Sequence, residues 1–367
     1  MTERRTDPAP PMPVLIDCDP GHDDAIAILM AAALPQLRLV GITTVAGNQT
    51  LEKTTRNARV VCGVAGISDV PIAAGADRPL VRDPITAAEV HGESGLDGPR
   101  LDGVEAPLDP RHAVELIVET YAAATEPVTL VAIGPLTNVA LALRLYPSLA
   151  ERIPLISLMG GAWGLGNVTP GAEFNMHADP DAARVVIESG IPIRMSGLEL
   201  TRHAAITDDV IERMADIDSA VGRFVGDILR FYRASHEARH GNADAPIFDA
   251  CAVAWLARPE LVDSRLMHVE VVTTAGPDLG RTVTGVEGVL GAGRHIACDP
   301  NSHSFLREIP QCWLTGQAAG VAAGLAANAG VAPRALDPVR VQQELLRQGA
   351  YLSPSVVAAA KKVVEAA

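Results

Sequence analysis

Acidic side chains gather in one short stretch near the start of the chain. Four carboxylates fall within eight positions, directly after the apolar run 14–16: Asp17, Asp19, Asp23 and Asp24. An apolar, helix-like pattern follows at once, over residues 25–34. Open α/β sheets keep their ligand sites where a buried strand ends just before a helix. Because carboxylates this close repel one another, the stretch predicts a hard, oxygen-seeking cation such as Ca²⁺ or Mg²⁺.

Other interpretations explain only part of this cluster. Asp24 could be an acid favoured by the helix dipole and Asp17 a turn residue, but neither accounts for all four acids. An EF-hand calcium loop needs an entering helix and a glutamate at its twelfth position, which this stretch lacks. A Mg²⁺-dependent phosphatase of the haloacid dehalogenase type would use Asp17 as its nucleophile, and Gly21 with the Asp23-Asp24 pair fits that pattern poorly.

The segment 17–25 resembles the N-terminal motif of the inosine-uridine-preferring nucleoside hydrolases, Asp-x-Asp-Pro-Gly-x-Asp-Asp-Ala. Further motifs of that family follow in the same order: Gly47-Asn48, the His-Gly-x-x-Gly segment at His91, and Ala-Glu-Phe-Asn at 172–175. The resemblance covers residues 14–285. It implies an α/β fold with an open, mostly parallel Rossmann-like sheet flanked by helices.

The distribution of apolar residues agrees with that fold class. Runs rich in β-branched residues predict strands at 37–45, 128–133, 153–159 and 191–196, with helical patterns between them. The run 128–133 is apolar throughout, as in the buried strands of parallel sheets. One long helical region is expected over 206–239.

Composition limits the partners and the compartment. A formal charge of −14 over 367 residues argues against nucleic acid or anionic membranes as partners. The five cysteines include no Cys-x-x-Cys pair, which suits a reducing, cytoplasmic setting. No stretch approaches the roughly 20 apolar residues that span a bilayer. Residues 1–13 are polar and proline-rich without an apolar signal core, so we expect a short disordered leader.

The resemblance implies a role for each candidate site residue. Calcium would be held by Asp19, Asp24, Asp249 and the carbonyl of Ile133, with Asp17 close behind, and Asp19 would be the base. The substrate would be bound by the following side chains: Asp23, Asn48, His91, Asn167, Glu173 and Asn175. Ordinary structural roles stay open for several of them, because Asn48 and Asp249 could be helix N-caps and His91 could lie in a flexible glycine-rich loop.

The chain departs from the family at the residue before Asp249. Many members have a histidine there, which protonates the departing base, whereas this chain has Phe248. Purine-preferring members carry an aromatic residue that stacks on the base, so Phe248 favours a lean toward purine nucleosides. The leaving-group acid is then open, with His236 and His240 as candidates.

The C-terminal part, residues 286–367, departs further. Its segment Trp-Leu-Thr-Gly-Gln-Ala-Ala-Gly at 313–320 resembles the C-terminal end of an FAD-dependent oxidoreductase, and most of this part is predicted to be helical. The alternative is an Ala/Gly-rich helix packed within its own domain. Because no strand in the chain is followed by Gly-x-Gly-x-x-Gly, we do not expect this part to bind FAD.

Together these observations predict Ca²⁺-dependent hydrolysis of the N-glycosidic bond of ribonucleosides, giving ribose and free base for salvage. We expect a cytoplasmic homo-oligomer, a dimer or tetramer, whose partner is a small nucleoside. The alternatives are the Mg²⁺-dependent phosphatase and a catalytically impaired fusion or binding protein.

Overall fold

The computed structural model describes residues 10–101, 103, 105–241, 245–286, 309–331, 333–350 and 352–353. The chain divides into two compact units. The first runs to Ser264 and includes Val269–Val283, and the second comprises Arg265–His268 and the chain from Thr284 onward. The 1–13 leader falls mostly outside the described residues, and the first strand begins at Met12.

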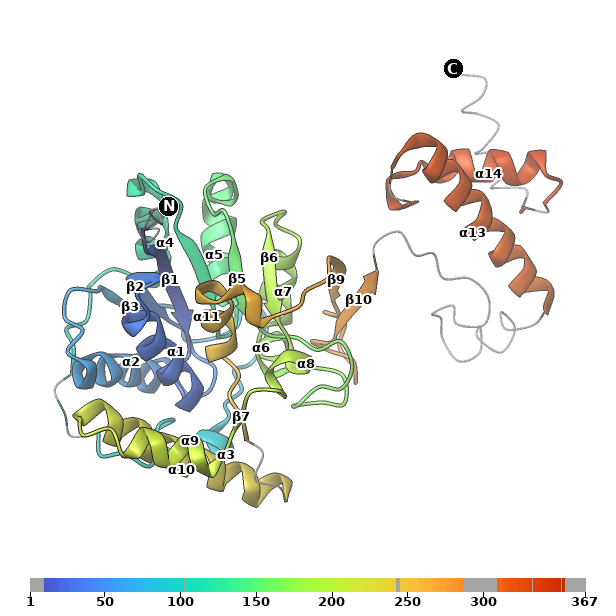
Figure 1. The fold of residues 1–367 in the computed structure, drawn as a ribbon. Helices are drawn as coiled ribbons and strands as arrows, with labels where there is room; N and C mark the ends of the chain where they lie inside the picture. The colour runs from blue at the N-terminus through green and yellow to red at the C-terminus, as the bar shows by residue number, and fades with distance from the viewer. Residues whose placement is uncertain are drawn as a thin grey trace, which may run out of the picture. The chain divides into compact units, whose positions relative to one another are not determined.

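A six-stranded parallel sheet forms the centre of the first unit (Figure 1). The strand order is β3-β2-β1-β4-β5-β6. The bounds are Met12–Cys18 for β1, Leu37–Thr44 for β2, Ile72–Ala74 for β3, Thr129–Ala132 for β4, Ile156–Met159 for β5 and Ile193–Ser196 for β6. The expected open parallel sheet is therefore confirmed.

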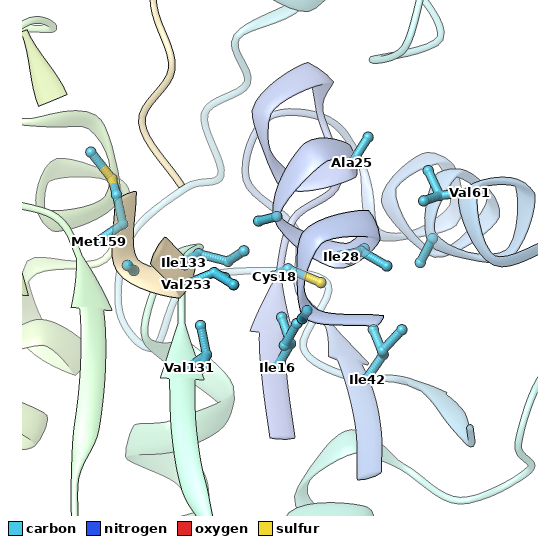
Figure 2. Close-up of a cluster of buried hydrophobic side chains, with 14 of the residues drawn as sticks. Ile16, Cys18, Ala25, Ile28, Ile42, Val61, Val131, Ile133, Met159 and Val253 are labelled. Atoms are coloured by element: carbon cyan, nitrogen blue, oxygen red, sulfur yellow. The ribbon is translucent and has the colours of Figure 1, made fainter. Parts of the chain in front are cut away.

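Alternating side chains of the strands fill two apolar layers, one on each face of the sheet. In β1, Val14, Ile16 and Cys18 enter one layer, whereas Leu15 enters the other. This alternation follows from the two-residue period of a strand. Figure 2 shows the first layer, in which strand residues meet side chains of three helices: Ala25 and Ile28, Val61, and Val253.

Helices cover both faces of the sheet. The first layer is closed by α1 (His22–Ala33), α2 (Leu51–Ala65) and α11 (Ala250–Ala257). The second is closed by α4 (Ala113–Ala123), α5 (Thr137–Leu145) and α7 (Pro180–Ile187). Helices on both faces are the usual consequence of parallel strands joined by crossover connections.

The remaining elements of the first unit are several short segments and two longer helices. The short ones are α3 (Ala88–His91), η1 (Pro147–Glu151), α6 (Phe174–Ala178), α8 (Leu198–Thr201), β7 (Ala205–Ile206), β8 (Ala245–Pro246) and η2 (Pro259–Leu261). The helical region expected over 206–239 comprises two helices, α9 (Asp208–Ala215) and α10 (Ala220–His240). Ser219 separates them because its side chain accepts the N–H of Gly222 and so caps α10.

The C-terminal part of the described chain is mostly helical. β9 (Met267–Val271) pairs with β10 (Thr282–Val286), and the second unit then contains α13 (Ile309–Ala329), η3 (Pro333–Ala335) and α14 (Pro338–Arg347). No described helix is long and apolar enough to cross a membrane.

Candidate active site

The order in which successive strands are added to the sheet reverses between β1 and β4. From β1 the strand order runs outward through β2 and β3, and from β4 it runs the opposite way through β5 and β6. Asp17 pairs with Ala132 across the two strands, and the Asp17 carbonyl accepts the N–H of Ile133 at 2.9 Å. Such a switch point is where open α/β sheets bind ligands, because the loops on either side part there.

Three buried acids meet beside this point. Ligand oxygens of Asp23, Asp24 and Asp249 all lie within 4.8 Å of one another. Asp23 and Asp24 begin α1, and Asp249 immediately precedes α11, which packs against α1. The Asp24 carboxylate accepts the backbone N–H of Asp19 at 3.1 Å and that of Gly21 at 2.9 Å, so it also fixes the turn that enters the helix.

Asp19 lies at the end of β1 in a tight backbone enclosure. Its Oδ2 accepts the N–H of Asn48 at 2.7 Å, and the Asn48 amide donates to the Asp19 carbonyl and to Asp24 Oδ2, both at 3.2 Å. A Cβ atom at Gly47 or Gly134 would collide with the Asp19 carboxylate. The loops after β2 and β4 can therefore close on Asp19 only because they carry glycine there.

Asp17 has a different environment from the other acids. Its Oδ1 accepts the Thr43 hydroxyl at 2.6 Å and the Asn138 amide at 2.8 Å. Asp17 is not one of the three acids whose oxygens lie within 4.8 Å. Burial raises the pKa of its carboxyl to about 7, against the lowering effect of these two donors.

Ionisation of the acidic cluster would leave negative charge that the described protein atoms do not neutralise. Burial raises the pKa of Asp19 and Asp249 well above the usual range, and their carboxylate neighbours add to the effect. Burial, then Asp24, raises the pKa of Asp23 to about 7. Among the described residues, Oδ1 of Asp19 and Oδ1 of Asp23 are buried without a hydrogen-bond partner. Unpaired buried carboxylate oxygens in a dense cluster are what a hard divalent cation requires, so the donor set fits Ca²⁺ or Mg²⁺.

Polar groups from the segment after β5 face the acids. The Glu173 carboxylate accepts the N–H of Gly161 and of Asn175, each at 2.9 Å. The Asn175 amide donates to the carbonyl of Ile133 at 3.1 Å, and Asn167 Oδ1 accepts the N–H of Phe174 at 2.9 Å. These bonds leave the Asn175 oxygen as an acceptor and the Asn167 amide nitrogen as a donor. Burial raises the pKa of Glu173 against these backbone donors.

Stacked aromatic rings surround His22, which lies inside the acidic motif. His22 stacks on Phe231 with ring centroids 5.1 Å apart and on His91 at 5.3 Å, and His91 also stacks on Tyr232. His22 Nδ1 lies 3.0 Å from His91 Nδ1. Burial lowers the pKa of His22 to about 4 and that of His91 well below its usual range.

One cleft of about 910 Å³ joins these parts. Ten of the sequence-predicted residues line it: Asp23, Asn48, His91, Ile133, Asn167, Glu173, Asn175, His236, Phe248 and Asp249. Asp17, Asp19 and Asp24 lie beneath this lining, fully or almost fully buried. His240 ends α10, and its side chain is outside the described part of the structure.

Known proteins are similar to this chain in sequence and in fold. The sequence model for "Inosine-uridine preferring nucleoside hydrolase" matches residues 14–321. The chain belongs to this family. The resemblance predicted from the motifs is thereby confirmed, and so is the enzyme class, a hydrolase acting on N-glycosyl compounds. Nothing in these comparisons supports the phosphatase alternative.

Individual relatives of this nucleoside hydrolase are closely similar. The pyrimidine-specific ribonucleoside hydrolase RihB of Escherichia coli K12 is 46% identical over 278 residues, which are 76% of this chain and 88% of that protein. RihB of Shigella sonnei gives the same values. Among solved structures, a plant nucleoside hydrolase, PpNRh1, has a TM-score of 0.73 and 29% identity, covering 79% of this chain and 91% of that one. A purine-preferring ribonucleoside hydrolase from Gardnerella vaginalis has a TM-score of 0.71 and 30% identity, covering 75% and 88%.

Several residues of this nucleoside hydrolase site were not singled out from the sequence. Thr43 and Asn138 hold Asp17, and Tyr232 lines the cleft. His22 stands inside the acidic motif itself, where a histidine carries no signal without its distant partner His91. Asn138 lies in the Gly-Pro-Leu-Thr-Asn segment after β4, and its position at the start of a helix next to β1 was the available signal.

Proposed function

We propose that this nucleoside hydrolase cleaves ribonucleosides with a divalent cation, Ca²⁺, and that pyrimidine ribonucleosides are its main substrates. The observation that carries the proposal is the buried acidic cluster at the cleft, with unpaired oxygens on Asp19 and Asp23. Carboxylate and carbonyl oxygens accept either Ca²⁺ or Mg²⁺, and Ca²⁺ is chosen from the family resemblance.

The cation would be held by Asp19, Asp24, Asp249 and the Ile133 carbonyl. When bound, it would polarise water and orient ribose hydroxyls. Asp19 is the base: its Oδ1 has no protein donor among the described residues, whereas its Oδ2 is fixed by Asn48, so one oxygen is oriented and the other is available for a proton.

Ribose hydroxyls both donate and accept hydrogen bonds, and the cleft offers both kinds of group. Asp23 and the Asn175 oxygen accept, and the Asn167 amide donates, while Glu173 is held rigid by backbone N–H groups. As the glycosidic bond breaks, positive charge develops on the sugar. Fixed carboxylates around it stabilise that charge without having to reorganise.

The departing base would leave toward the α10 side of the cleft. His236 and Phe248 both line that cleft, and Phe248 also packs against the apolar core, which holds its ring in place. We assign His236 the role of proton donor to the base and Phe248 that of an apolar surface against the base ring.

The relatives do not support the sequence-based lean toward purines. It rested on Phe248 alone, whereas the chain is 46% identical to RihB, which is named as pyrimidine-specific. The purine-preferring structural neighbour is 30% identical. One aromatic residue contributes roughly 0.5–1.5 kcal/mol through stacking, which is too little to decide a preference against the rest of the cleft.

The test is the release of base and ribose from uridine, cytidine, inosine and guanosine, with added Ca²⁺ and with chelator. We expect the highest kcat/KM for uridine or cytidine, and loss of turnover from all four in chelator. Higher kcat/KM for inosine would contradict the pyrimidine assignment. Turnover that is insensitive to chelator would contradict the role of the cation.

Replacing Phe248 tests its contact with the base. Phe248→Leu keeps an apolar side chain and removes the ring, so we expect kcat/KM for inosine to fall roughly two- to tenfold, the range of one aromatic contact. The effect on uridine should be smaller, because a pyrimidine offers one ring instead of two. Phe248→Ala serves as the comparison that also removes apolar area. Equal losses for inosine and uridine in Phe248→Leu would argue against stacking.

A further inference from the structure

His22 occupies a closed environment at the start of α1. Its side chain is 1% exposed. Its ring lies nearly parallel to Phe231, at an interplanar angle of 6°, and stacks on Tyr232 and His91 with centroids 5.6 and 5.3 Å away. The partners of its two ring nitrogens are a backbone carbonyl and another imidazole, neither of which is anionic. Such a ring is neutral, with one proton on its two nitrogens.

The position of that proton follows from the carbonyl. His22 Nε2 lies 2.8 Å from the carbonyl oxygen of Asp97. A carbonyl oxygen only accepts, so Nε2 carries the hydrogen and Nδ1 carries a lone pair. The 3.0 Å contact between His22 Nδ1 and His91 Nδ1 then needs a hydrogen from His91.

A second contact at His91 Nδ1 does not change this assignment. The backbone N–H of His22 also points at this nitrogen as a donor, at the longer distance of 3.3 Å. If His91 Nδ1 accepted that hydrogen, His22 would need protons on both ring nitrogens to keep its two shorter bonds. A doubly protonated ring would be a buried cation whose two nitrogens contact no carboxylate, which is unfavourable.

We propose that His22 is a positioning residue of this enzyme, which holds the neutral ring of His91 with its proton on Nδ1 and with Nε2 as a hydrogen-bond acceptor toward the cleft. His91 lines the cleft that also contains the acids and the sugar-binding groups. The group that meets His91 Nε2 is therefore a donor of the substrate, a hydroxyl or an N–H. Neutral His91 does not protonate the departing base. This inference rests on the proposed function for the identity of the substrate, but not for the state of the ring.

Hydrogen bonds around Asp97 hold in place the carbonyl that meets His22 Nε2. The Asp97 carboxylate accepts the N–H groups of Glu93 at 3.1 Å and Ser94 at 3.0 Å, and the Ser94 hydroxyl as well. The Asp97 N–H donates to the carbonyl of His91 at 3.3 Å. The segment that begins at His91 thus returns at Asp97 to hold His22, which in turn holds His91.

Close packing adds to the orientation. A Cβ atom at Gly21 would lie 2.6 Å from His91 Nδ1, so the ring of His91 fills the space that a side chain at position 21 would occupy. The glycine before His22 therefore allows the two imidazoles to approach each other.

Nuclear magnetic resonance of the ¹⁵N-histidine-labelled protein tests the ring state directly, without substrate. Long-range ¹H–¹⁵N correlations distinguish the two tautomers, and the His91 signals are assigned by their loss in His91→Gln. We expect the Nδ1–H tautomer at His91 in the unmodified protein, and the Nε2–H tautomer in His22→Phe. An Nε2–H tautomer at His91 in the unmodified protein would overturn the proposal, whether or not the protein hydrolyses nucleosides.

Kinetics separate positioning from packing. His22→Phe keeps a ring in the stack and removes the acceptor, whereas His22→Asn keeps an acceptor near the Nδ1 position and removes the ring. For His22→Phe we expect kcat/KM to fall about 10- to 100-fold, the size found when a group that orients a functional histidine is removed. His22→Asn should retain most of kcat/KM. Equal losses in the two variants would show that His22 only packs, and so would refute the proposal. If His22→Phe does not fold, the kinetics of His22→Asn and the tautomer of His91 in the unmodified protein still test the proposal.

Discussion

Asp19→Asn is expected to lower kcat about 10³-fold or more, the upper range for loss of a general base, while the protein keeps its fold. The amide has nearly the shape of the carboxylate, and it can still accept the N–H of Asn48 through its oxygen. It cannot take a proton from water at neutral pH, and it is a weaker ligand for a cation. The variant therefore removes both proposed roles of Asp19 without leaving a cavity.

The same variant should be more stable than the unmodified protein when chelator is present. Burial, and then the charge of Asp24, disfavours the ionised form of Asp19, and the amide removes that charge. Asp69→Asn is the matched control, because Asp69 is an exposed acid in the loop after α2. We expect no change in either kcat or melting temperature for the control. Near-normal turnover by Asp19→Asn in the nucleoside assay would refute the assignment of the base.

In chelator, the melting temperature should fall by about 5 °C or more between pH 4 and pH 7, which corresponds to a change of a few kcal/mol in the free energy of unfolding. Burial raises the pKa of Asp17 and Asp23 to about 7 in the folded protein, from a usual value of 3.8. At pH 4 the folded protein binds these protons fully, whereas the unfolded chain, with a pKa of 3.8, binds fewer than half of them. As the pH rises, the unfolded chain loses them first, so the folded state becomes the less favoured one until the pH passes the folded pKa.

A bound cation should reverse this trend. It would interact with ionised carboxylates only, so its stabilising effect should grow as the pH rises from 4 to 7. The measurement is a set of melting curves across that range, with Ca²⁺ and with chelator. Asp109, whose pKa Arg111 lowers to about 2, titrates below this window and does not mask the effect. A melting temperature in chelator that rises from pH 4 to pH 7 would contradict the electrostatic account of the cluster.

Much of the site could be predicted from the acidic motif at 17–24, because its residues are adjacent in the sequence. Asp19, Asp23 and Asp24 share one strand end and one helix start, so their proximity follows from a few residues of backbone. The open parallel sheet could also be predicted, since the apolar strands and helices alternate along the chain. The contribution of Asp249 needed the family resemblance, because it depends on the packing of α11 against α1.

What the sequence did not predict depends on contacts between distant segments. His22 acquires its role from His91 and Asp97, and Asp17 is held by Thr43 and Asn138 from two other elements. The comparisons do not support the purine lean, and the reason is different. That lean gave one side chain, Phe248, more weight than the whole cleft that surrounds the base.

The position of Asp249 couples formation of the acidic cluster to the folding of the chain. Asp24 is translated early and Asp249 late, and both reach the cluster only when α11 docks on α1. Mutual repulsion of the acids opposes that docking, while the apolar residues of α11, such as Val253 and Leu256, favour it. A newly made chain in a cation-poor compartment would therefore spend more time with α11 detached and its apolar face open to proteases and aggregation. The proposed cation would favour the docking of α11, so it would stabilise the folded chain as well as take part in the reaction.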